Sequence, residues 1–359
     1  MERGELGAGV AVLVEGEVVV DLWGGWADEG RSRVWERDTV VNVWSTTKGV
    51  TALCAHVLVE RGLLELDAPV AAYWPEFGAA GKESVLVRHL LSHRAGLAGL
   101  RQPHTLEQLY DWELTTSRLA AMAPWWEPGT VSGYHVLTYG YLVGEVIRRV
   151  TGLMPGEFLR REVTGPLGVD FTIGLPEQDA GRAAELVHQA APSDSEQGTV
   201  FAQMAPVAIA ALVNPAAGAA EANTAAWRAA EIPAANGHGT ARAVAALYDV
   251  FTGRPGPDRL LSPEAVERAR EGQGACHDLV LGSAFPHETE LGLGLWLSGA
   301  NHSYGPNPRA FGHDGYGGSF GMADPEAGVS IGYVMNRMGP NIADDPRKRA
   351  LIAAVYDAL

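Results

Sequence analysis

Hydrophobic positions at the two ends of the chain follow a strand-like pattern, and those in the middle follow a helical one. Strands are predicted where apolar and β-branched residues form short runs between turn residues, at 9–14, 18–22, 39–44, 291–297, 310–324 and 329–336. Helices are predicted where apolar residues recur every three or four positions, at 45–62, 84–97, 105–122, 139–150, 241–251 and 346–359. Residues 176–235 are rich in alanine, proline and glycine and are interpreted as helices joined by loops.

Strands at both ends around a helical middle predict an α/β (α+β) fold in which one sheet is completed by both ends of the chain. We expect a sheet domain formed by residues 1–65 and 255–359, with a mainly helical domain, residues 66–254, inserted between them. The active site is expected in the cleft between the two.

Composition narrows the class of protein. Apolar residues make up 47% and charged residues 19% of the 359, which is typical of a soluble globular protein. The net charge of −16 argues against nucleic acid and anionic membranes as partners. The two cysteines suggest neither a disulfide framework nor a metal site. No signal peptide or run of about 18 apolar residues is found, so a cytoplasmic location is expected, and the oligomeric state is left open.

The start of the helix predicted at 45–62 holds the first candidate chemistry. If Ser45 lies in the first turn, Lys48 shares its face, with Cβ atoms roughly 5–6 Å apart. A lysine whose pKa is lowered by burial can accept the proton of a serine hydroxyl and so make the serine a nucleophile. This spacing is the S-x-x-K arrangement of penicillin-binding proteins and serine β-lactamases.

The alternative interpretation is a threonine-rich helix cap followed by an exposed lysine. The chain has 14 serines but only three lysines, against 24 arginines, so lysine is rarely used on its surface. Lys48 also begins a very apolar helix, where a surface lysine has little reason to be. Both observations favour the catalytic interpretation.

Other motifs are less convincing. Ser319 and Ser330 each match G-x-S-x-G, but that motif requires a strand, a sharp turn and a helix, and no histidine follows His313. His89 and His93 are four residues apart, yet the glutamate of a zinc-binding helix is missing, so structural histidines are expected.

Two further elements would complete an S-x-x-K site. Tyr134 precedes a predicted helix on a glycine-flanked turn, which makes it the candidate proton shuttle, with a buried loop tyrosine as the alternative. Residues 311–318 place glycines around polar residues, so that an edge strand can approach a ligand closely. The backbone amides of Ser45 and Tyr316 are the candidate oxyanion hole.

The chain as a whole resembles the β-lactamase-related serine hydrolases with the class C β-lactamase fold, especially the family VIII carboxylesterases. The matching stretches are Asp-Leu-Trp-Gly-Gly at 21–25, Ser-Thr-Thr-Lys-Gly-Val-Thr at 45–51, Leu-Leu-Ser-His at 90–93, Pro-Gly-Thr at 128–130, Asn-Gly-His-Gly at 236–239 and Gly-His-Asp-Gly at 312–315. The resemblance implies an antiparallel sheet flanked by helices. It also implies Ser45 as nucleophile, Lys48 with Tyr134 as the proton-transfer pair, and no metal or cofactor.

Departures from the family pattern bear on the substrate. The Y-x-N element of class C β-lactamases ends in Val136, which cannot bind a side-chain amide. The K-T-G element reads His313, Asp314, Gly315, so a titratable histidine replaces a permanent cation. The amino terminus is also shorter than is usual among relatives.

The expected function is therefore hydrolysis of small carboxylic esters through an acyl-enzyme. Trp44, Trp125 and Trp126 are candidates to line an apolar substrate pocket, with ordinary packing as the alternative. An acyltransferase using the same acyl-enzyme, a weak β-lactamase or peptidase, and a non-catalytic binding protein are the other functions considered. The expected partner is a small ester.

Overall fold

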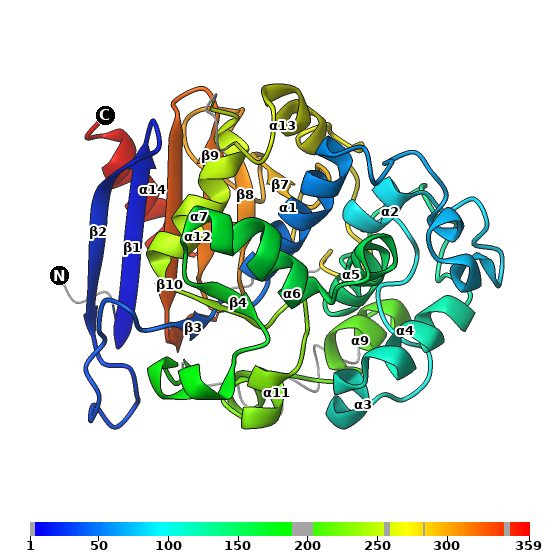
Figure 1. Cartoon of the computed structure of the whole chain (residues 1–359), viewed down its shortest axis with the longest axis horizontal. Helices are drawn as coiled ribbons and strands as arrows, with labels where there is room; N and C mark the ends of the chain where they lie inside the picture. The colour runs from blue at the N-terminus through cyan, green and yellow to red at the C-terminus, as the bar shows by residue number, and fades with distance from the viewer. Residues whose placement is uncertain (1–3, 189–203, 255–258, 283, 341–344) are drawn as a thin grey trace.

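Six strands drawn from the two ends of the chain form one sheet. The structure is a computed structural model that describes residues 4–188, 204–254, 259–282, 284–340 and 345–359 (Figure 1). The strands of this sheet are β1 (Gly7–Val14), β2 (Glu17–Gly25), β7 (Trp296–Leu297), β8 (Phe311–Asp314), β9 (Phe320–Asp324) and β10 (Val329–Met335). Their order is β2-β1-β10-β9-β8-β7, and every neighbouring pair is antiparallel.

The pairing of β1 with β10 joins the beginning of the chain to its end. Val10 lies opposite Tyr333, and the register continues from Ala8 to Val14. This pairing confirms the expected mixed fold with an antiparallel sheet built from both ends. The domain boundaries stay a prediction.

Helix α12 (Ala241–Asp249) packs across this sheet, against β1, β9 and β10. Its backbone approaches β10 so closely that a Cβ added to Gly332 would lie 2.3 Å from the Ala241 carbonyl oxygen. Helix α14 (Pro346–Tyr356) is joined to the sheet by hydrogen bonds from Lys348 to β8 and from Tyr356 to β9.

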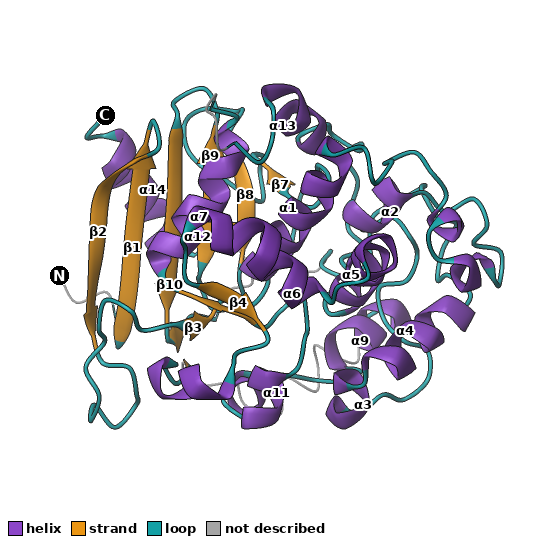
Figure 2. Ribbon diagram, viewed as in Figure 1, coloured by secondary structure: helices purple, strands orange, loops and turns teal. Residues whose placement is uncertain are grey.

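The helical part of the molecule lies beside the sheet, as the purple ribbons on the right of Figure 2 show. Its α-helices are α2 (Val87–Leu91), α3 (Leu106–Tyr110), α4 (Trp112–Ala121), α5 (Thr138–Thr151), α6 (Pro155–Leu159), α7 (Gly165–Leu167), α9 (Pro206–Val213), α10 (Ala219–Ala222) and α11 (Ala225–Ala229). The shorter helical turns are Val70–Ala72, Pro75–Gly78, Arg160–Thr164, Glu177–Arg182 and Val250–Thr252. Helix α13 (Pro263–Ala269) follows α12 and packs on α1 (Thr46–Glu60).

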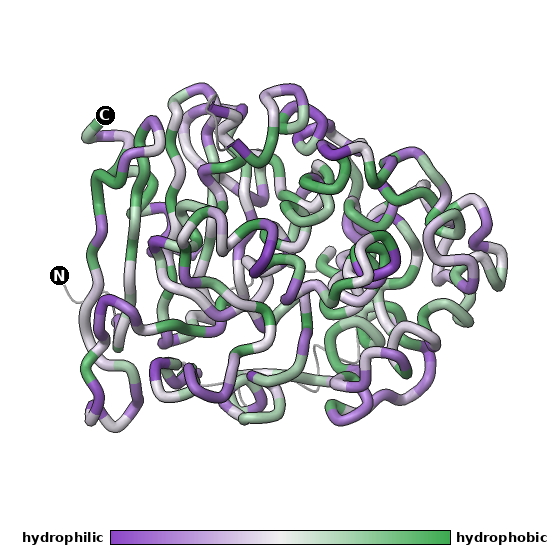
Figure 3. The backbone as a smooth tube through the Cα atoms, viewed as in Figure 1, coloured by the Kyte–Doolittle hydropathy of each residue, from purple (hydrophilic) through white to green (hydrophobic). Residues whose placement is uncertain are grey.

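Helix α1 is the buried centre of the protein. It contacts α5 and α6 on one side and β8, β9 and α12 on the other. All its residues from Thr46 to Leu58 are buried. In Figure 3 hydrophobic stretches run through the sheet and the central helices, and hydrophilic ones gather on the outer loops. Within the described residues, no helix has the length and apolar character needed to cross a bilayer.

Two small sheets fix the loops near the start of α1. β3 (Val41–Asn42) and β4 (Phe171–Ile173) both pair with β6 (Gly237–Gly239). β5 (Val187–His188) pairs in parallel with β11 (Arg337–Met338).

Several predicted elements are shorter or divided in the structure. The strand predicted over 310–324 is the pair β8 and β9, because the chain turns at Gly317 and Gly318, both with positive φ. The helix predicted over 105–122 is split where the Asp111 side chain caps α4. The tight turn predicted at 236–240 is strand β6, and Thr240 caps α12 as expected. Only Val87–Leu91 of the helix predicted over 84–97 is α-helical.

Candidate active site

Ser45 lies at the point where the chain leaves β3 and enters α1. It is the N-cap residue, one position before the first helical turn in which it was expected. Trp44, just before it, has a φ of 48°, a left-handed conformation that is unfavourable for a bulky residue. The Trp44 ring is held between Trp227 and Tyr316, with centroids 5.4 and 5.7 Å away. This packing fixes the direction in which Ser45 leaves the strand.

Lys48 reaches Ser45 from the next turn of the helix. Its Nζ lies 3.0 Å from Ser45 Oγ, 2.8 Å from the Val136 carbonyl oxygen and 2.9 Å from the Ala234 carbonyl oxygen. Carbonyl oxygens only accept hydrogen bonds, so they take two amine hydrogens. Complete burial holds the pKa of Lys48 well below its usual range. A neutral amine in this position therefore points its lone pair at the Ser45 hydroxyl.

All three lysines of the chain are buried, which explains why the residue is so rare. Lys82 donates to the carbonyl oxygens of Ala79, Ala120 and Met122. Lys348 instead bonds both carboxylate oxygens of Asp314, at 2.7 and 2.8 Å. Among the described residues, Lys48 has no such carboxylate partner.

Tyr134 completes the group around Ser45. The Lys48 Nζ lies 4.7 Å from its ring centroid, and the ring packs between His93 and Trp296, at 4.7 and 5.6 Å. Burial raises the pKa of Tyr134 above its usual value, although hydrogen bonding to Ser45 opposes the shift. The phenol thus keeps its proton at neutral pH and has one to give.

The turn after β8 lies against the Ser45 segment. A Cβ added to Gly315 would lie 2.3 Å from the Val43 carbonyl oxygen and 2.8 Å from Thr46 Oγ1, so only glycine allows this approach. Within the described part of the chain, the backbone amides of Ser45 and Tyr316 have no hydrogen-bond acceptor. Both are available to a substrate oxygen, as an oxyanion hole requires.

His313 lies beside Tyr134, with ring centroids 6.2 Å apart. Its Nδ1 lies 2.8 Å from the Asp314 carbonyl oxygen, an acceptor, so Nδ1 carries the proton. Burial lowers the pKa of His313 to about 3. The imidazole is therefore neutral, and its buried Nε2, which has no partner among the described residues, presents a lone pair.

The sequence matches one protein family along almost its whole length, the family described as Beta-lactamase, over residues 1–356. The chain belongs to the beta-lactamase family. It is 38% identical over 344 residues to Esterase/beta-lactamase LipL of Mycobacterium tuberculosis, a match that covers 92% of this chain and 77% of that protein.

Two solved structures of this family superpose closely on the chain. A crystal structure of a family VIII carboxylesterase is 43% identical, with a TM-score of 0.92, covering 99% of this chain and 93% of that one. A novel penicillin-binding protein homolog from Caulobacter crescentus is also 43% identical, with a TM-score of 0.89 and the same coverage. The resemblance and the fold class expected from the sequence are confirmed.

Val136, at the position of the Y-x-N asparagine, and Asp314, within the K-T-G position, both make contacts inside the protein. Val136 binds Lys48 through its backbone carbonyl. The Asp314 carboxylate turns away from His313, as neighbours on a strand do, and binds Lys348, with His302 Nδ1 3.4 Å away. Burial alone would raise the pKa of Asp314, but the Lys348 ammonium and His302 hold it below its usual range. The Asp314 carboxylate is therefore occupied by a contact within the protein.

The tryptophans differ in their surroundings. Trp44 is buried, as described above. Trp126 donates to the Val131 carbonyl oxygen and packs on Gly133, next to Tyr134. Trp125 donates to the Gly99 carbonyl oxygen and lies under the Arg101 guanidinium. Their role as a substrate pocket stays a prediction.

The two serines that match G-x-S-x-G, Ser319 and Ser330, are both buried. Ser319 is buried and donates to the Val43 carbonyl oxygen at 2.8 Å, so it braces the turn against the Ser45 segment. Ser330 is buried within β10, 3.4 Å from Asp249. The two histidines of 84–97 each accept a backbone hydrogen bond, His89 from Leu86 and His93 from His135, which fits the structural role expected.

The sequence did not reveal which groups orient the candidate catalytic side chains of Lys48 and Tyr134. The carbonyls of Val136 and Ala234, which orient Lys48, belong to residues whose identity carries no chemical signal. Trp296 and Asp278, which contact Tyr134, come from a segment far along the chain. Asp278 follows Cys276 by two residues in a glycine-rich loop, but no sequence motif around it indicates a role.

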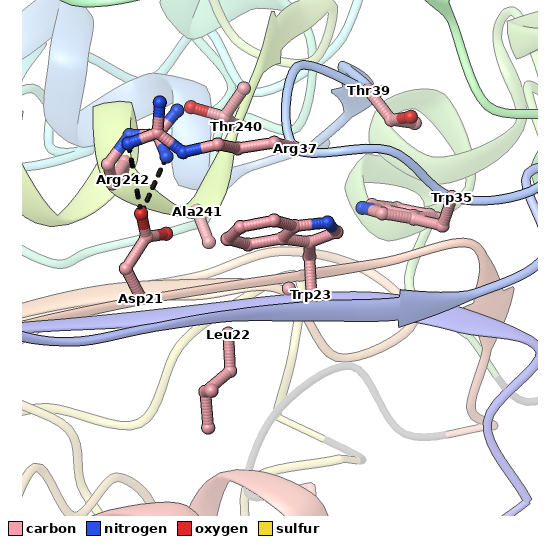
Figure 4. A pocket seen from close by; sticks show the side chains of 10 residues that line it. Asp21, Leu22, Trp23, Trp35, Arg37, Thr39, Thr240, Ala241 and Arg242 are labelled. Carbon is pink, nitrogen blue, oxygen red and sulfur yellow. Dashed lines mark hydrogen bonds and ion pairs between the residues drawn. The ribbon is translucent and has the colours of Figure 1, made fainter.

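A separate small pocket lies at the β2 edge of the sheet (Figure 4). Asp21 there binds Arg242 at 2.7 Å and Arg37 at 3.4 Å, and Trp23 lies on the same side of the strand while Leu22 points to the other. None of the predicted catalytic residues lines it, so it is distinct from the candidate active site.

Proposed function

We propose that the protein hydrolyses small carboxylic esters through an acyl-enzyme on Ser45. The observation that carries this proposal is the set of contacts around the Lys48 amine. Two carbonyls occupy its hydrogens and leave the lone pair for the Ser45 hydroxyl, in a site buried enough to favour the neutral form. This is the arrangement that activates a serine without a histidine or a metal.

The proton path follows from the same geometry. As Ser45 Oγ attacks the ester carbonyl carbon, its proton passes to Lys48 Nζ, and the carbonyl oxygen becomes an oxyanion facing the Ser45 and Tyr316 amides. Tyr134 gives its phenolic proton to the leaving alcohol oxygen and recovers one from Lys48. Water then repeats the attack on the acyl group, gives its proton to the same pair, and Ser45 is restored as the acid leaves.

Relatives support the choice of ester. Two relatives are described as esterases. One is the Mycobacterium tuberculosis esterase/beta-lactamase, and the other is Esterase EstB of Burkholderia gladioli, to which the chain is 32% identical over 200 residues, about half of each chain. The class of enzyme expected from the sequence, a carboxylesterase-type serine hydrolase of the beta-lactamase family, is confirmed by these relatives and by the family VIII carboxylesterase structure.

The test of the nucleophile is covalent labelling. Incubation with a fluorophosphonate, followed by digestion and mass spectrometry, should give one adduct on the peptide that contains Ser45. Ser45→Ala should abolish the adduct and Ser319→Ala should leave it in place, since Ser319 is buried and already hydrogen-bonded. An adduct on Ser319 or Ser330 would show that the wrong motif was chosen.

Esters should be much better substrates than β-lactams. His313 offers a lone pair where a β-lactam carboxylate needs a hydrogen-bond donor, and the Val136 side chain offers no partner to the side-chain amide. A buried polar group left unpaired costs roughly 1–3 kcal/mol, and about 1.4 kcal/mol is tenfold in rate. We expect kcat/KM for p-nitrophenyl butyrate to exceed that for nitrocefin by roughly several hundredfold.

The control for this comparison restores the missing donor. His313→Lys should raise nitrocefin turnover relative to ester turnover, because it supplies a cation where beta-lactamases carry the K-T-G lysine. Equal kcat/KM values for the two substrates in the unmodified enzyme would contradict the prediction.

A further inference from the structure

The loop that carries Tyr134 is tied to a distant segment by one buried carboxylate. Asp278 Oδ1 accepts a hydrogen bond from the Tyr134 backbone amide at 3.0 Å. The other oxygen, Oδ2, accepts one from the Ser132 hydroxyl, also at 3.0 Å. Asp278 is only 4% exposed, so these bonds are sheltered from competition with water.

The same carboxylate also organises its own turn. The amides of Val280 and Leu281 donate to Oδ1 at 2.9 and 2.8 Å. The two segments are further joined by the Leu279 amide, which donates to the Ser132 carbonyl oxygen at 3.0 Å. Hydrogen bonds to a carboxylate are roughly twice as strong as neutral ones, so the two bonds that Asp278 accepts from Ser132 and Tyr134 join the two loops firmly.

Side-chain packing alone leaves one movement of Tyr134 open. His93 and Trp296 confine the plane of its ring. The distance of the hydroxyl from Ser45 and Lys48, however, depends on where the backbone of residue 134 stands along that plane. A displacement of about 1 Å can cost roughly 100-fold in rate when a catalytic group must meet a reacting atom.

We propose that Asp278 is a positioning residue of the active site, which fixes the Tyr134 backbone so that the phenol can transfer its proton. The inference rests on the proposed function, since it requires Tyr134 to be the proton shuttle. Asp278 acts through Tyr134 and does not itself take part in the chemistry.

The test is a double-mutant cycle. Asp278→Ala should lower kcat on p-nitrophenyl butyrate by roughly 10- to 100-fold and leave KM within about threefold, because the displaced group acts in the chemical step. In a Tyr134→Phe background the same substitution should change kcat by less than about threefold, since the proton donor that Asp278 positions is already gone. Asp278→Asn keeps an oxygen for the Tyr134 amide but not the charge, so it should recover part of the loss and leave kcat roughly five- to tenfold below that of the unmodified enzyme.

Asp324→Ala is the matched control. Asp324 is also fully buried and its carboxylate also caps a turn, accepting bonds from the amides of Glu326 and Ala327 and from Asn307. It should lower Tm about as much as Asp278→Ala and leave kcat within about twofold. If Asp278→Ala fails to fold, the cycle is run with Asp278→Asn, whose smaller loss should likewise vanish in the Tyr134→Phe background.

Two outcomes would overturn the inference in distinguishable ways. Equal losses of kcat on changing Asp278 in the unmodified and Tyr134→Phe enzymes, or no loss at all, would refute the positioning role alone. A Tyr134→Phe enzyme with undiminished kcat would refute the proton-transfer assignment and the role of Asp278 together. Ser45 labelling would still test the nucleophile independently.

Discussion

Ser45→Ala is expected to lower kcat/KM for p-nitrophenyl butyrate by roughly 10⁴-fold or more. In the proposed mechanism the Ser45 hydroxyl forms the acyl-enzyme and gives its proton to Lys48, whose amine hydrogens are taken by two carbonyl oxygens. Steady-state kinetics on purified enzyme would measure the loss, and unchanged Tm would show that the fold is intact. Retention of more than about 1% of the activity would argue that another residue is the nucleophile.

The loss of kcat/KM in Ser45→Ala should not become larger when Lys48 or Tyr134 is substituted as well. In the proposed mechanism Ser45, Lys48 and Tyr134 act on one proton, so we expect their substitutions to be grossly non-additive. Tyr134→Phe alone should be severely damaging, yet Ser45→Ala combined with Tyr134→Phe should be about as active as Ser45→Ala. A multiplicative loss would mean that the two residues serve separate steps.

The sequence was sufficient to predict the fold class because the signal lies in long periodic runs. Strands β1, β2 and β10 and helices α1, α5, α12 and α14 were all expected close to their observed bounds. Short elements were missed where tertiary pairing decides the conformation. Strand β6, for example, is formed by Gly237–Gly239, whose sequence is typical of a turn, and only its pairing with β3 and β4 makes it a strand.

The proximity of the candidate catalytic side chains was predictable for a different reason. Ser45 and Lys48 are near each other in the sequence, so helical geometry alone brings them within reach. Tyr134 and Tyr316 were candidates from their glycine-rich surroundings, and the family resemblance then implied that both belong to the Ser45 site. The structure brings the Tyr134 ring to 4.7 Å from Lys48 Nζ and the Tyr316 ring to 5.7 Å from Trp44.

The sequence could not predict which backbone groups, or which residues distant in the chain, contact the candidate catalytic residues. Any residue at 136 or 234 supplies the carbonyl that orients Lys48, so no residue type marks those positions. The partner of Asp314 could not be predicted either, because its carboxylate binds Lys348 only when α14 packs beside β8. The rarity of lysine was the most useful compositional signal, because each of the three proved to be buried.

Lys48→Met is expected to lower kcat/KM by roughly 10²- to 10⁴-fold, the range associated with loss of a positioned general base. Methionine has about the length of lysine but no proton-accepting nitrogen, and it leaves the Val136 and Ala234 carbonyls without their donor. The matched control is Lys82→Met, which removes a buried lysine held by three carbonyls away from the site. It should lower Tm comparably and leave kcat/KM within about twofold.

The pH dependence of kcat/KM tests the protonation state of Lys48 in the unmodified enzyme. The amine accepts a proton only when neutral, so protonation of Lys48 at low pH must reduce activity. Because burial lowers the pKa of Lys48 well below its usual range, activity should reach its plateau well below the usual lysine pKa and should fall only on the acid side of that plateau. A charged lysine with an ordinary pKa of about 10.4 would instead give activity that rises roughly tenfold per pH unit up to about pH 10. That slope would show that Lys48 rests as an ammonium donating to Ser45, and the base would have to be sought elsewhere, with the neutral His313 Nε2 as the next group to test.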